Sequence, residues 1–561
     1  MRHLRLLTFS VSLLAILVSG LLLAQSNPAP LVNQPNEILP RPLPSGQSSP
    51  AGFKASVPRS NPQTGSNFAP AVTYDSGGYG AASVAVADVN RDGKPDLIVA
   101  NACASINGNS CTDTDGVIGV LMGNGDGTFQ PPVTYDSGPL GAQVVAVSDV
   151  NGDRFPDLIV SNGCYGVNNC SDSVSVLLGN GDGTFKTPVV YSSGGYFPYA
   201  VAIADVNRDG KPDVLVVNTC ADNTCGTDGT VGVLLGNGDG TFQPAVVYDS
   251  GGAFAMSVAV AALNGDGKPD LVVAYQGCFN CQTNPNVGVL LGNGDGTFQT
   301  SVPYETVGYF ATSVAVADVN GDGKPDLLVV NECSEFTCKK PGSVAVLLGN
   351  GDGTFQPAVA YSSGGIFPFS VAVADVNGEG KLDLLLANFC ADLPCTNKGL
   401  LGVLLGNGDG TFQSAVTYAT GGYDTFWMAA ADVNGDGKPD LLATNFCADS
   451  KCTTHGTVSA LLNKAMHAKT ATKVTSSPNP SRVHEAVTIT ARIASNPIVP
   501  DGELVTFHSG KTNLGTGKTT NGVATLTTSF SKAKIYTIKA SYPGDAFHKP
   551  SSGTVKQVVN P

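Results

Sequence analysis

A nine-residue acidic string recurs seven times along the chain, and this periodicity limits the fold more than any other feature. The string Asp-Val-Asn-x-Asp-Gly-Lys-Pro-Asp, or a near copy, begins at Asp88, Asp149, Asp205, Ala262, Asp318, Asp375 and Asp432. Successive copies start at nearly equal intervals, each long enough for four short strands and their turns. Seven units of this size are typical of a ring of four-stranded blades. The sequence therefore predicts an all-β, seven-bladed β-propeller.

Each unit reads as four short strands. In the first unit we predict them at residues Ser83–Val89, Asp96–Asn101, Val117–Met122 and Thr128–Tyr135. A second repeated string, Gly-Asn-Gly-Asp-Gly-Thr-Phe, stands between the third and fourth strands, and its glycines suit a tight turn. Two prolines in the fourth strand place it at a sheet edge, where a missing N–H donor is harmless.

The two ends of the array predict how the ring closes. The last unit stops near Asn463, without the Gly-Asp-Gly-Thr-Phe string and the strand that follows it. Residues 67–74 match residues 411–418 of the sixth unit, where such a strand is present. We therefore predict that residues 67–74 form the outer strand of the blade built from residues 427–463. Closure of this kind covers the otherwise exposed edge of the last blade's third strand.

The acidic string has the oxygen donors and the sharp glycine turn that calcium prefers. Side chains at positions 1, 3, 5 and 9 and the backbone carbonyl at position 7 would supply the ligands. An EF-hand is excluded, because Val99 stands where that motif needs a bidentate Glu. The predicted calcium ligands are Asp88, Asn90, Asp92, Lys94, Asp96, Asp149, Asn151, Asp153, Phe155, Asp157, Asp205, Asn207, Asp209, Lys211, Asp213, Asn264, Asp266, Lys268, Asp270, Asp318, Asn320, Asp322, Lys324, Asp326, Asp375, Asn377, Glu379, Lys381, Asp383, Asp432, Asn434, Asp436, Lys438 and Asp440.

The alternative is an Asx-rich turn that holds no ion. We favour calcium, because three crowded carboxylates repel one another without a cation. Magnesium would use fewer protein ligands. Three copies depart from the pattern: the fourth has Ala262 at position 1, the sixth has Glu379 at position 5, and the second has Arg154 at the turn glycine. The fourth copy is expected to be the weakest site.

Fourteen cysteines form seven close pairs, one in the loop between the second and third strands of each unit. Behind an export signal, this pattern indicates seven local disulfides. Zinc binding and redox catalysis are the alternatives, but neither has the additional ligands or βαβ context that it needs. The prediction pairs Cys103 with Cys111, Cys164 with Cys170, Cys220 with Cys225, Cys278 with Cys281, Cys333 with Cys338, Cys390 with Cys395 and Cys447 with Cys452.

The N-terminal residues read as an export signal. Arg2 and Arg5 precede a mostly apolar stretch that ends before Gln25, so we expect a signal peptide at residues 1–24. An uncleaved membrane anchor is the alternative. Residues 25–64 are rich in Pro and Ser and are expected to be a disordered linker. The mature chain is expected to be secreted or held at the cell surface, as a monomer without a membrane span. The formal net charge of the full chain, −14, argues against a nucleic-acid partner.

With these motifs, residues 65–464 resemble the FG-GAP/VCBS repeat family, which includes the propeller of integrin α subunits. The resemblance implies calcium in the loops on one face of the ring and ligands often met on the other. Residues 469–560 look like a bacterial Ig-like domain, an interpretation that their alternating strands support. Such domains usually act as spacers or adhesive modules on secreted proteins.

The sequence favours a calcium-binding adhesion or binding module for an extracellular glycan or protein. Aromatic residues in the loops that lead into the first strands suit sugar stacking or peptide anchoring, although many could instead pack between blades. No catalytic motif stands out, so an enzyme is not expected. The alternatives are a passive structural protein of the cell surface and the propeller of a polysaccharide-active enzyme. The candidate ligand-binding residues are Tyr79, Tyr196, Phe254, Tyr309, Phe367 and Trp427.

Overall fold

The computed structural model describes residues 68–561 except 108–109, 112–114, 164–172, 278–284, 336, 465–468, 496–497, 500 and 545–547. The predicted signal peptide (residues 1–24) and linker (residues 25–64) lie outside the described residues. Among the described residues, no helix is long and apolar enough to cross a membrane. The chain divides into two compact units after Leu462, and each is described separately.

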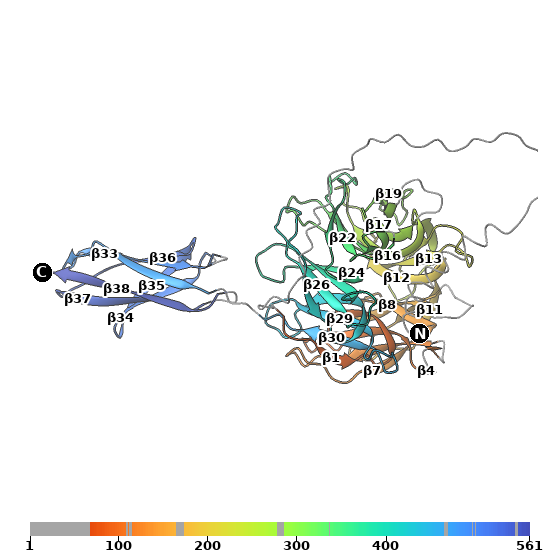
Figure 1. Ribbon diagram of the computed structural model, residues 1–561, viewed down its shortest axis with the longest axis horizontal. Coiled ribbons are helices and arrows are strands. Elements are labelled where there is room, and N and C mark those ends of the chain that lie inside the picture. The colour runs from red at the N-terminus through yellow and green to blue at the C-terminus, as the bar shows by residue number, and fades with distance from the viewer. Residues whose placement is uncertain are drawn as a thin grey trace, which may run out of the picture. The chain divides into compact units, whose positions relative to one another are not determined.

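The first unit is a seven-bladed β-propeller, as predicted (Figure 1). Its first strands contact one another around the ring and are β2 (Tyr79–Ala87), β8 (Gly141–Ser148), β12 (Tyr196–Ala204), β16 (Ala253–Ala261), β20 (Tyr309–Ala317), β24 (Ile366–Ala374) and β28 (Tyr423–Ala431). The second strands are β3 (Asp96–Cys103), β9 (Asp157–Gly163), β13 (Asp213–Cys220), β17 (Asp270–Gly277), β21 (Asp326–Cys333), β25 (Asp383–Cys390) and β29 (Asp440–Cys447).

The third and fourth strands complete each antiparallel sheet. The third strands are β6 (Asp115–Leu121), β10 (Ser173–Leu177), β14 (Thr230–Leu234), β18 (Pro285–Leu290), β22 (Ser343–Leu347), β26 (Leu400–Leu404) and β30 (Thr457–Leu461). The fourth strands are β7 (Val133–Pro139), β11 (Val189–Ser192), β15 (Val246–Asp249), β19 (Val302–Glu305), β23 (Val359–Ser362), β27 (Val416–Ala419) and β1 (Val72–Asp75). A small hairpin of β4 (Ile106–Asn107) and β5 (Ser110–Cys111) extends blade 1.

The boundaries of the first blade differ from those predicted. Strand β2 begins at Tyr79, ahead of Ser83, because the segment before the alternating run also pairs, around a bulge, with β3. Strand β7 begins at Val133 and not at Thr128. Ahead of it Phe129 forms an isolated bridge with Gly123, and equivalent bridges recur in other blades, including those with no proline at this point.

The ring closes as predicted from the two truncated ends. Strand β1 pairs antiparallel with β30, so the sheet order of the seventh blade is β1-β30-β29-β28. Figure 1 shows β1 beside β30, although the two strands lie at opposite ends of the propeller sequence. The N–H of Ala69 donates to the carbonyl of Leu462 at 2.7 Å and extends this pairing.

One aromatic pair joins each blade to the next. The tyrosine of a fourth strand meets, edge-on, the phenylalanine that precedes the fourth strand of the following blade, with ring centroids 5.2 to 5.5 Å apart. Edge-on pairs of this kind contribute about 0.5–1.5 kcal/mol beyond burial. The seven pairs are Tyr74–Phe129, Tyr135–Phe185, Tyr191–Phe242, Tyr248–Phe298, Tyr304–Phe355, Tyr361–Phe412 and Tyr418–Phe68.

A hydroxyl also links most neighbouring blades near the axis. In four blades a serine of the first strand accepts a hydrogen bond from a backbone N–H of the next blade. Blade 7 has Trp427 at that position, and there Thr444 of the second strand donates to the Ala82 carbonyl of blade 1 at 3.1 Å. Blades 7 and 1 therefore keep a hydroxyl hydrogen bond between them despite the large indole, but the hydroxyl comes from the second strand and not from the first. The four serines are Ser83, Ser257, Ser313 and Ser370.

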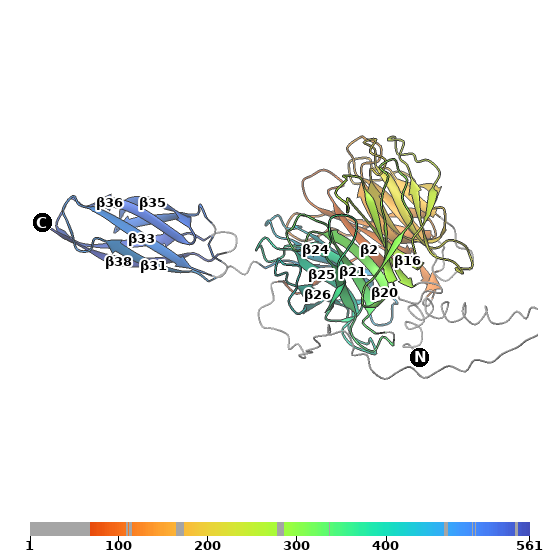
Figure 2. The ribbon, with the colours of Figure 1, turned by 90° about the horizontal axis from the view of Figure 1, so that it is seen from above.

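The second unit is the predicted Ig-like domain. Figure 2 shows several of its strands lying along one another. Strand β35 pairs with β34 over most of its length and with β36 at its last two residues, which joins the two halves into one eight-stranded, barrel-like sheet. Its strands are β31 (Ala471–Ser477), β32 (Ser481–Arg482), β33 (Ala486–Ala494), β34 (Leu504–Ser509), β35 (Thr512–Thr520), β36 (Val523–Ser529), β37 (Lys534–Tyr542) and β38 (Ser551–Asn560).

Candidate functional site

The strand register places two kinds of loop on opposite faces of the propeller. In blade 1, Ala87 pairs with Asp96 at one end of the first hairpin, so the acidic loop lies at that end. At the other end Tyr79 pairs with Cys103, which begins the cysteine loop. The same register recurs in other blades, for example in the pairing of Tyr423 with the first cysteine of blade 7. We call these two surfaces the acidic-loop face and the cysteine-loop face.

Each acidic loop is held by its own backbone. In blade 1 the N–H of Asp92 donates to Asp88 Oδ1 at 3.0 Å and to Asn90 Oδ1 at 2.9 Å, so these two oxygens converge. The N–H of Gly93 donates to Asp88 Oδ2, and that of Lys94 donates to Asp92 Oδ1. The loops of blades 3, 5 and 7 repeat these bonds. Each of these oxygens keeps a second lone pair for another partner.

The aspartate at position 9 is set apart from the other loop carboxylates. Asp96 is fully buried; its Oδ2 accepts a hydrogen bond from the N–H of Val89 and its Oδ1 accepts one from the N–H of Gly123. It therefore fastens the acidic loop to the glycine-rich turn of the same blade. Burial raises the pKa of this carboxyl, and in blade 2 it raises the pKa of Asp157 to about 6.

The irregular copies behave differently from one another. In blade 2, Arg154 adopts a left-handed backbone (φ 69°) and its N–H donates to Asp149 Oδ2 at 2.7 Å, as the turn glycine does elsewhere. The second loop thus keeps the common geometry. In blade 4, Ala262 offers no side-chain oxygen, and only the bonds to Asn264 and Asp266 remain. Nowhere in the described loops do three carboxylates come within 4.8 Å of one another.

Four of the seven predicted cysteine pairs are disulfides of the described chain. They are Cys220–Cys225, Cys333–Cys338, Cys390–Cys395 and Cys447–Cys452. This part of the prediction is confirmed, and each confirmed bridge closes a loop within a single blade.

The other three predicted pairs are not settled by the described residues. Cys103 is disulfide-bonded, but the side chain of its predicted partner Cys111 is not described. In blade 2, Cys164 and Cys170 both lie outside the described residues. In blade 4, Cys278 and Cys281 also lie outside them. These three pairings therefore stay predictions.

The six candidate ligand-binding aromatics lie on the cysteine-loop face or near the axis, and none is exposed. Phe254 is only 5% exposed because it packs against Cys220 and Ala253 of the core. Trp427 contacts two core clusters. The others are half-buried, so each combines packing with some open surface. They are Tyr79, Tyr196, Tyr309 and Phe367.

A cluster of four phenylalanines on blades 6 and 7 was only partly foreseen from the sequence. Phe426 lies at its centre, with ring centroids 4.7 Å from Phe369, 5.5 Å from Phe389 and 5.6 Å from Phe446. Phe389 and Phe446 end buried strands and look like ordinary core residues. The signal that could have shown them is the repeated Asn-Phe-Cys, which occurs in these two blades alone. We call these four residues the phenylalanine cluster.

Two acidic groups that lie outside the acidic loops are buried in the propeller. Glu332 of blade 5 is 8% exposed, and burial raises the pKa of its carboxyl to about 7. Burial, with a smaller contribution from the charge of Glu332, raises the pKa of Tyr199 in blade 3 to about 12. Asp424 of blade 7 is 6% exposed, and burial raises its pKa to about 7 as well.

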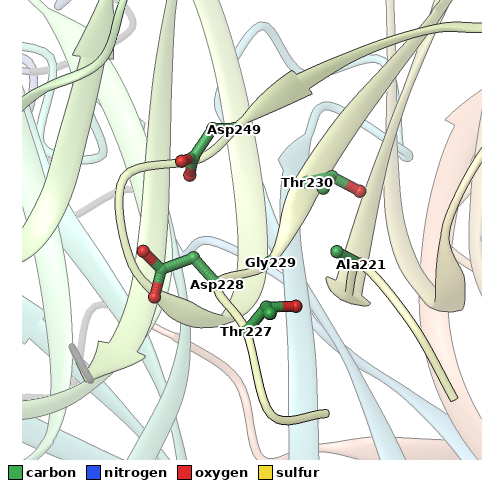
Figure 3. Close-up of a pocket in the computed structure, with 6 residues that line it drawn as sticks. All are labelled: Ala221, Thr227, Asp228, Gly229, Thr230 and Asp249. Carbon is green, nitrogen blue, oxygen red and sulfur yellow. The ribbon is translucent and has the colours of Figure 1, made fainter. Parts of the chain in front are cut away.

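A hollow in blade 3 carries a third unusual acidic group (Figure 3). Burial and the charge of Asp249 raise the pKa of Asp228, and Asp228 Oδ1 has no hydrogen-bond partner. Blade 7 has His455 and Asp75 at these two positions, with Nδ1 2.9 Å from Asp75 Oδ1. Blade 3 thus presents two carboxylates where blade 7 pairs one with an imidazole. The hollow is lined by Ala221, Thr227, Asp228, Gly229, Thr230 and Asp249.

Comparison with known families matches both units. The FG-GAP-like repeat matches residues 149–216, 221–273, 278–329, 336–386 and 390–443, and the FG-GAP repeat matches residues 80–105. The bacterial Ig-like domain (group 3) matches residues 474–560. Together the FG-GAP ranges match parts of all seven blades, and the last range ends within blade 7.

Individual relatives are distant. Phosphatidylinositol-glycan-specific phospholipase D of Bos taurus is 30% identical over 170 residues, which are 26% of this chain and 19% of that protein. Among solved structures, the V. cholerae biofilm matrix protein Bap1 is 13% identical, with a TM-score of 0.36 over 69% of this chain and 88% of that one. The extracellular domain of a one component system from B. thetaiotaomicron is 8% identical, with a TM-score of 0.37 over 86% and 56%. The chain thus spans about a fifth of the length of its curated relative.

Proposed function

This chain belongs to the FG-GAP repeat proteins, and from that premise we propose that it is an extracellular module that binds a carbohydrate or protein ligand on the cysteine-loop face of its propeller. A propeller joined to an Ig-like domain suggests a non-catalytic module. The observation that carries the proposal is the phenylalanine cluster. Four rings grouped on one side of the cysteine-loop face give an apolar platform.

A carbohydrate is the ligand that we favour. Pyranose rings can stack their apolar faces on aromatic side chains. Phe369 and Phe426 are half-buried, so their rings keep some surface free for such a contact. A protein ligand would use the same rings as buried anchors.

The first test combines a glycan array with two variants. We expect the intact protein to bind a subset of glycans, and Phe426→Ala to weaken that binding at least about tenfold, since a buried aromatic anchor contributes about 2 kcal/mol or more. Val189→Ala on an exposed outer strand is the matched control and should bind normally. Equal binding by the two variants would argue against a role of the phenylalanine cluster in binding. If no glycan on the array is bound and a protein partner is recovered instead, the ligand is a protein.

We also propose that the acidic loops bind calcium and that the ion stabilises the fold without taking part in chemistry. Every donor in a complete loop is an oxygen, which suits a hard cation. Asp88 Oδ1 and Asn90 Oδ1 already converge on one N–H, and Asp92 and the Lys94 carbonyl lie in the same turn. These four residues would hold the ion together with the position-9 carboxylate Asp96, whose oxygens also accept backbone N–H bonds.

Chelation is therefore expected to lower the melting temperature of the propeller and to leave that of the Ig-like domain unchanged. Extracellular calcium modules bind with dissociation constants on the order of 10⁻⁴–10⁻³ M, and an ion bound only by the native state stabilises it by mass action. Asp92→Ala should remove about one ion per chain, whereas Asp266→Ala should change the stoichiometry less, because its loop lacks the first carboxylate. Calorimetry and metal analysis would check both. A propeller that melts unchanged after verified metal removal would refute the calcium role.

A further inference from the structure

The disulfide of the blade-7 cysteine loop has a carboxyl group beside it. Asp424 Oδ2 lies 3.8 Å from Cys447 Sγ and 3.9 Å from Cys452 Sγ, and the side chain is 6% exposed. The two sulfurs are joined in a disulfide and have no hydrogen to donate. No other hydrogen-bonding partner of this carboxyl is found in the described part of the chain. A protonated carboxyl can instead donate its own hydrogen to sulfur, a weak acceptor.

The other blades show that the carboxyl is special to blade 7. The equivalent residue has a left-handed backbone throughout; it is a glycine in blade 1, a leucine in blade 2 and a phenylalanine in blades 3 to 6. Aspartate tolerates this backbone better than phenylalanine does. Backbone preference alone would explain an exposed aspartate, but it does not explain an acid enclosed against a disulfide. The phenylalanines are Phe197, Phe254, Phe310 and Phe367.

The two sulfurs of this disulfide differ in access. Cys452 is half-buried and Cys447 is 1% exposed, so an external thiolate reaches Cys452 first. Attack there forms a new S–S bond to Cys452 and releases Cys447 as a thiolate. A thiolate in so buried a place is costly unless it gains a proton or a counter-charge. The neighbouring carboxyl can supply that proton.

We propose that the blade-7 disulfide is a thiol-exchange site, in which Asp424 protonates the departing Cys447 sulfur as an external thiol becomes linked to Cys452. The step is balanced: the external thiolate and the disulfide give a mixed disulfide at Cys452, a Cys447 thiol and an Asp424 carboxylate. No net oxidation occurs. The external thiol is the sole co-reactant, and solvent returns the proton to Asp424.

The pH dependence of the step follows from the surroundings of Asp424. Strands β2, β24, β25 and β29 pack against β28. Their acidic groups are Asp383 and Asp440, which begin β25 and β29 at the acidic-loop end, and β2 adds the phenol of Tyr79. None of these shifts the pKa of Asp424, which burial alone raises to about 7. Below pH 7 the carboxyl holds the proton that the leaving sulfur needs. Above pH 7 its negative charge opposes formation of a thiolate beside it. Exchange at blade 7, relative to a loop without a carboxyl, should therefore fall as the pH rises through 7.

Reduced glutathione is a suitable probe, and the loop of blade 6 is an internal control. Cys390–Cys395 has the same spacing and the same pattern of one buried and one half-buried sulfur, but has Phe367 in place of Asp424. Full-length protein is incubated with glutathione between pH 5.5 and 8.5, quenched by alkylation and mapped by mass spectrometry. The ratio of modification at Cys452 to that at Cys395 cancels the ionisation of glutathione itself.

We expect this ratio to be at least about tenfold higher at pH 5.5 than at pH 8.5, since a positioned general acid typically contributes about 10²-fold or more. In Asp424→Asn the ratio should lose its dependence on pH. A ratio that is constant with pH in the unaltered protein would overturn the proposal, as would an Asn variant that keeps the dependence. Because the unaltered protein alone gives the first result, the test does not depend on the variant folding.

Discussion

A chain that begins at residue 77, and so lacks β1, is expected to melt at least about 5 °C below a chain that begins at residue 65. Strand β1 supplies four residue pairs to β30, whose five residues are all buried. Phe68, which precedes it, is 1% exposed and meets Tyr418 edge-on at 5.2 Å. Loss of one buried phenylalanine typically costs about 3–5 kcal/mol. In a propeller of roughly 400 residues, that alone lowers the melting temperature by about 5 °C.

Calorimetry of the two truncated chains is the direct measurement. Both lack the predicted signal peptide and linker, so the comparison isolates the strand that closes the ring. Phe68→Ala in the longer chain should reproduce a large part of the loss, because it removes the ring that packs against Tyr418. If the chains that begin at residues 65 and 77 have the same melting temperature, the closing strand contributes nothing to stability.

The second large effect is expected at a buried aspartate of an acidic loop. Asp326 is fully buried, its Oδ2 accepts a hydrogen bond from the N–H of Val319 at 2.9 Å, and its Oδ1 accepts one from the N–H of Gly349 at 2.8 Å. Asp326→Ala leaves two enclosed N–H groups without acceptors. Each unsatisfied group costs about 1–3 kcal/mol, so the free energy of unfolding should fall by about 2–6 kcal/mol.

Asp322 of the same loop is the matched control. Its side chain is 40% exposed and accepts one backbone hydrogen bond, from Lys324. With a chelator present, so that no ion is lost in either variant, Asp322→Ala should cost less than about 1 kcal/mol. Asp326→Asn should fall between the two, because one amide oxygen can still accept. Urea denaturation would rank the three variants, and similar losses for Asp322→Ala and Asp326→Ala would contradict the role given to burial.

Much of the fold could be predicted because the same acidic string recurs seven times along the chain. The blade number follows from the spacing of the acidic strings, and the ring closure follows from the match between residues 67–74 and 411–418. Strand limits were less accurate. The first strand starts earlier than its alternation suggests, because pairing continues past a bulge that breaks the period.

The site was harder to predict, because burial depends on contacts between blades. The spacing of the acidic loops made all their aspartates look alike, yet Asp96 and its equivalents are enclosed while Asp88 and Asp92 are not. The phenylalanines that end the second strands of blades 6 and 7 looked like core residues, since nothing local shows that their rings meet Phe426. The position of Asp424 beside a disulfide could not be predicted, because the two cysteines are distant from it in sequence.

The position of β1 also determines how the propeller meets a mechanical load. Chain enters the ring at Phe68 and Ala69 and leaves it at Leu462 and Asn463, and the N–H of Ala69 donates to the Leu462 carbonyl. A force applied at these two points acts at the same end of the β1–β30 pairing. The hydrogen bonds between the strands are therefore loaded and broken one at a time, and do not share the force. The four residue pairs of β1 would separate first and open the ring, while the other six blades stay folded. Tension on the chain would then separate β1 from the rest of blade 7.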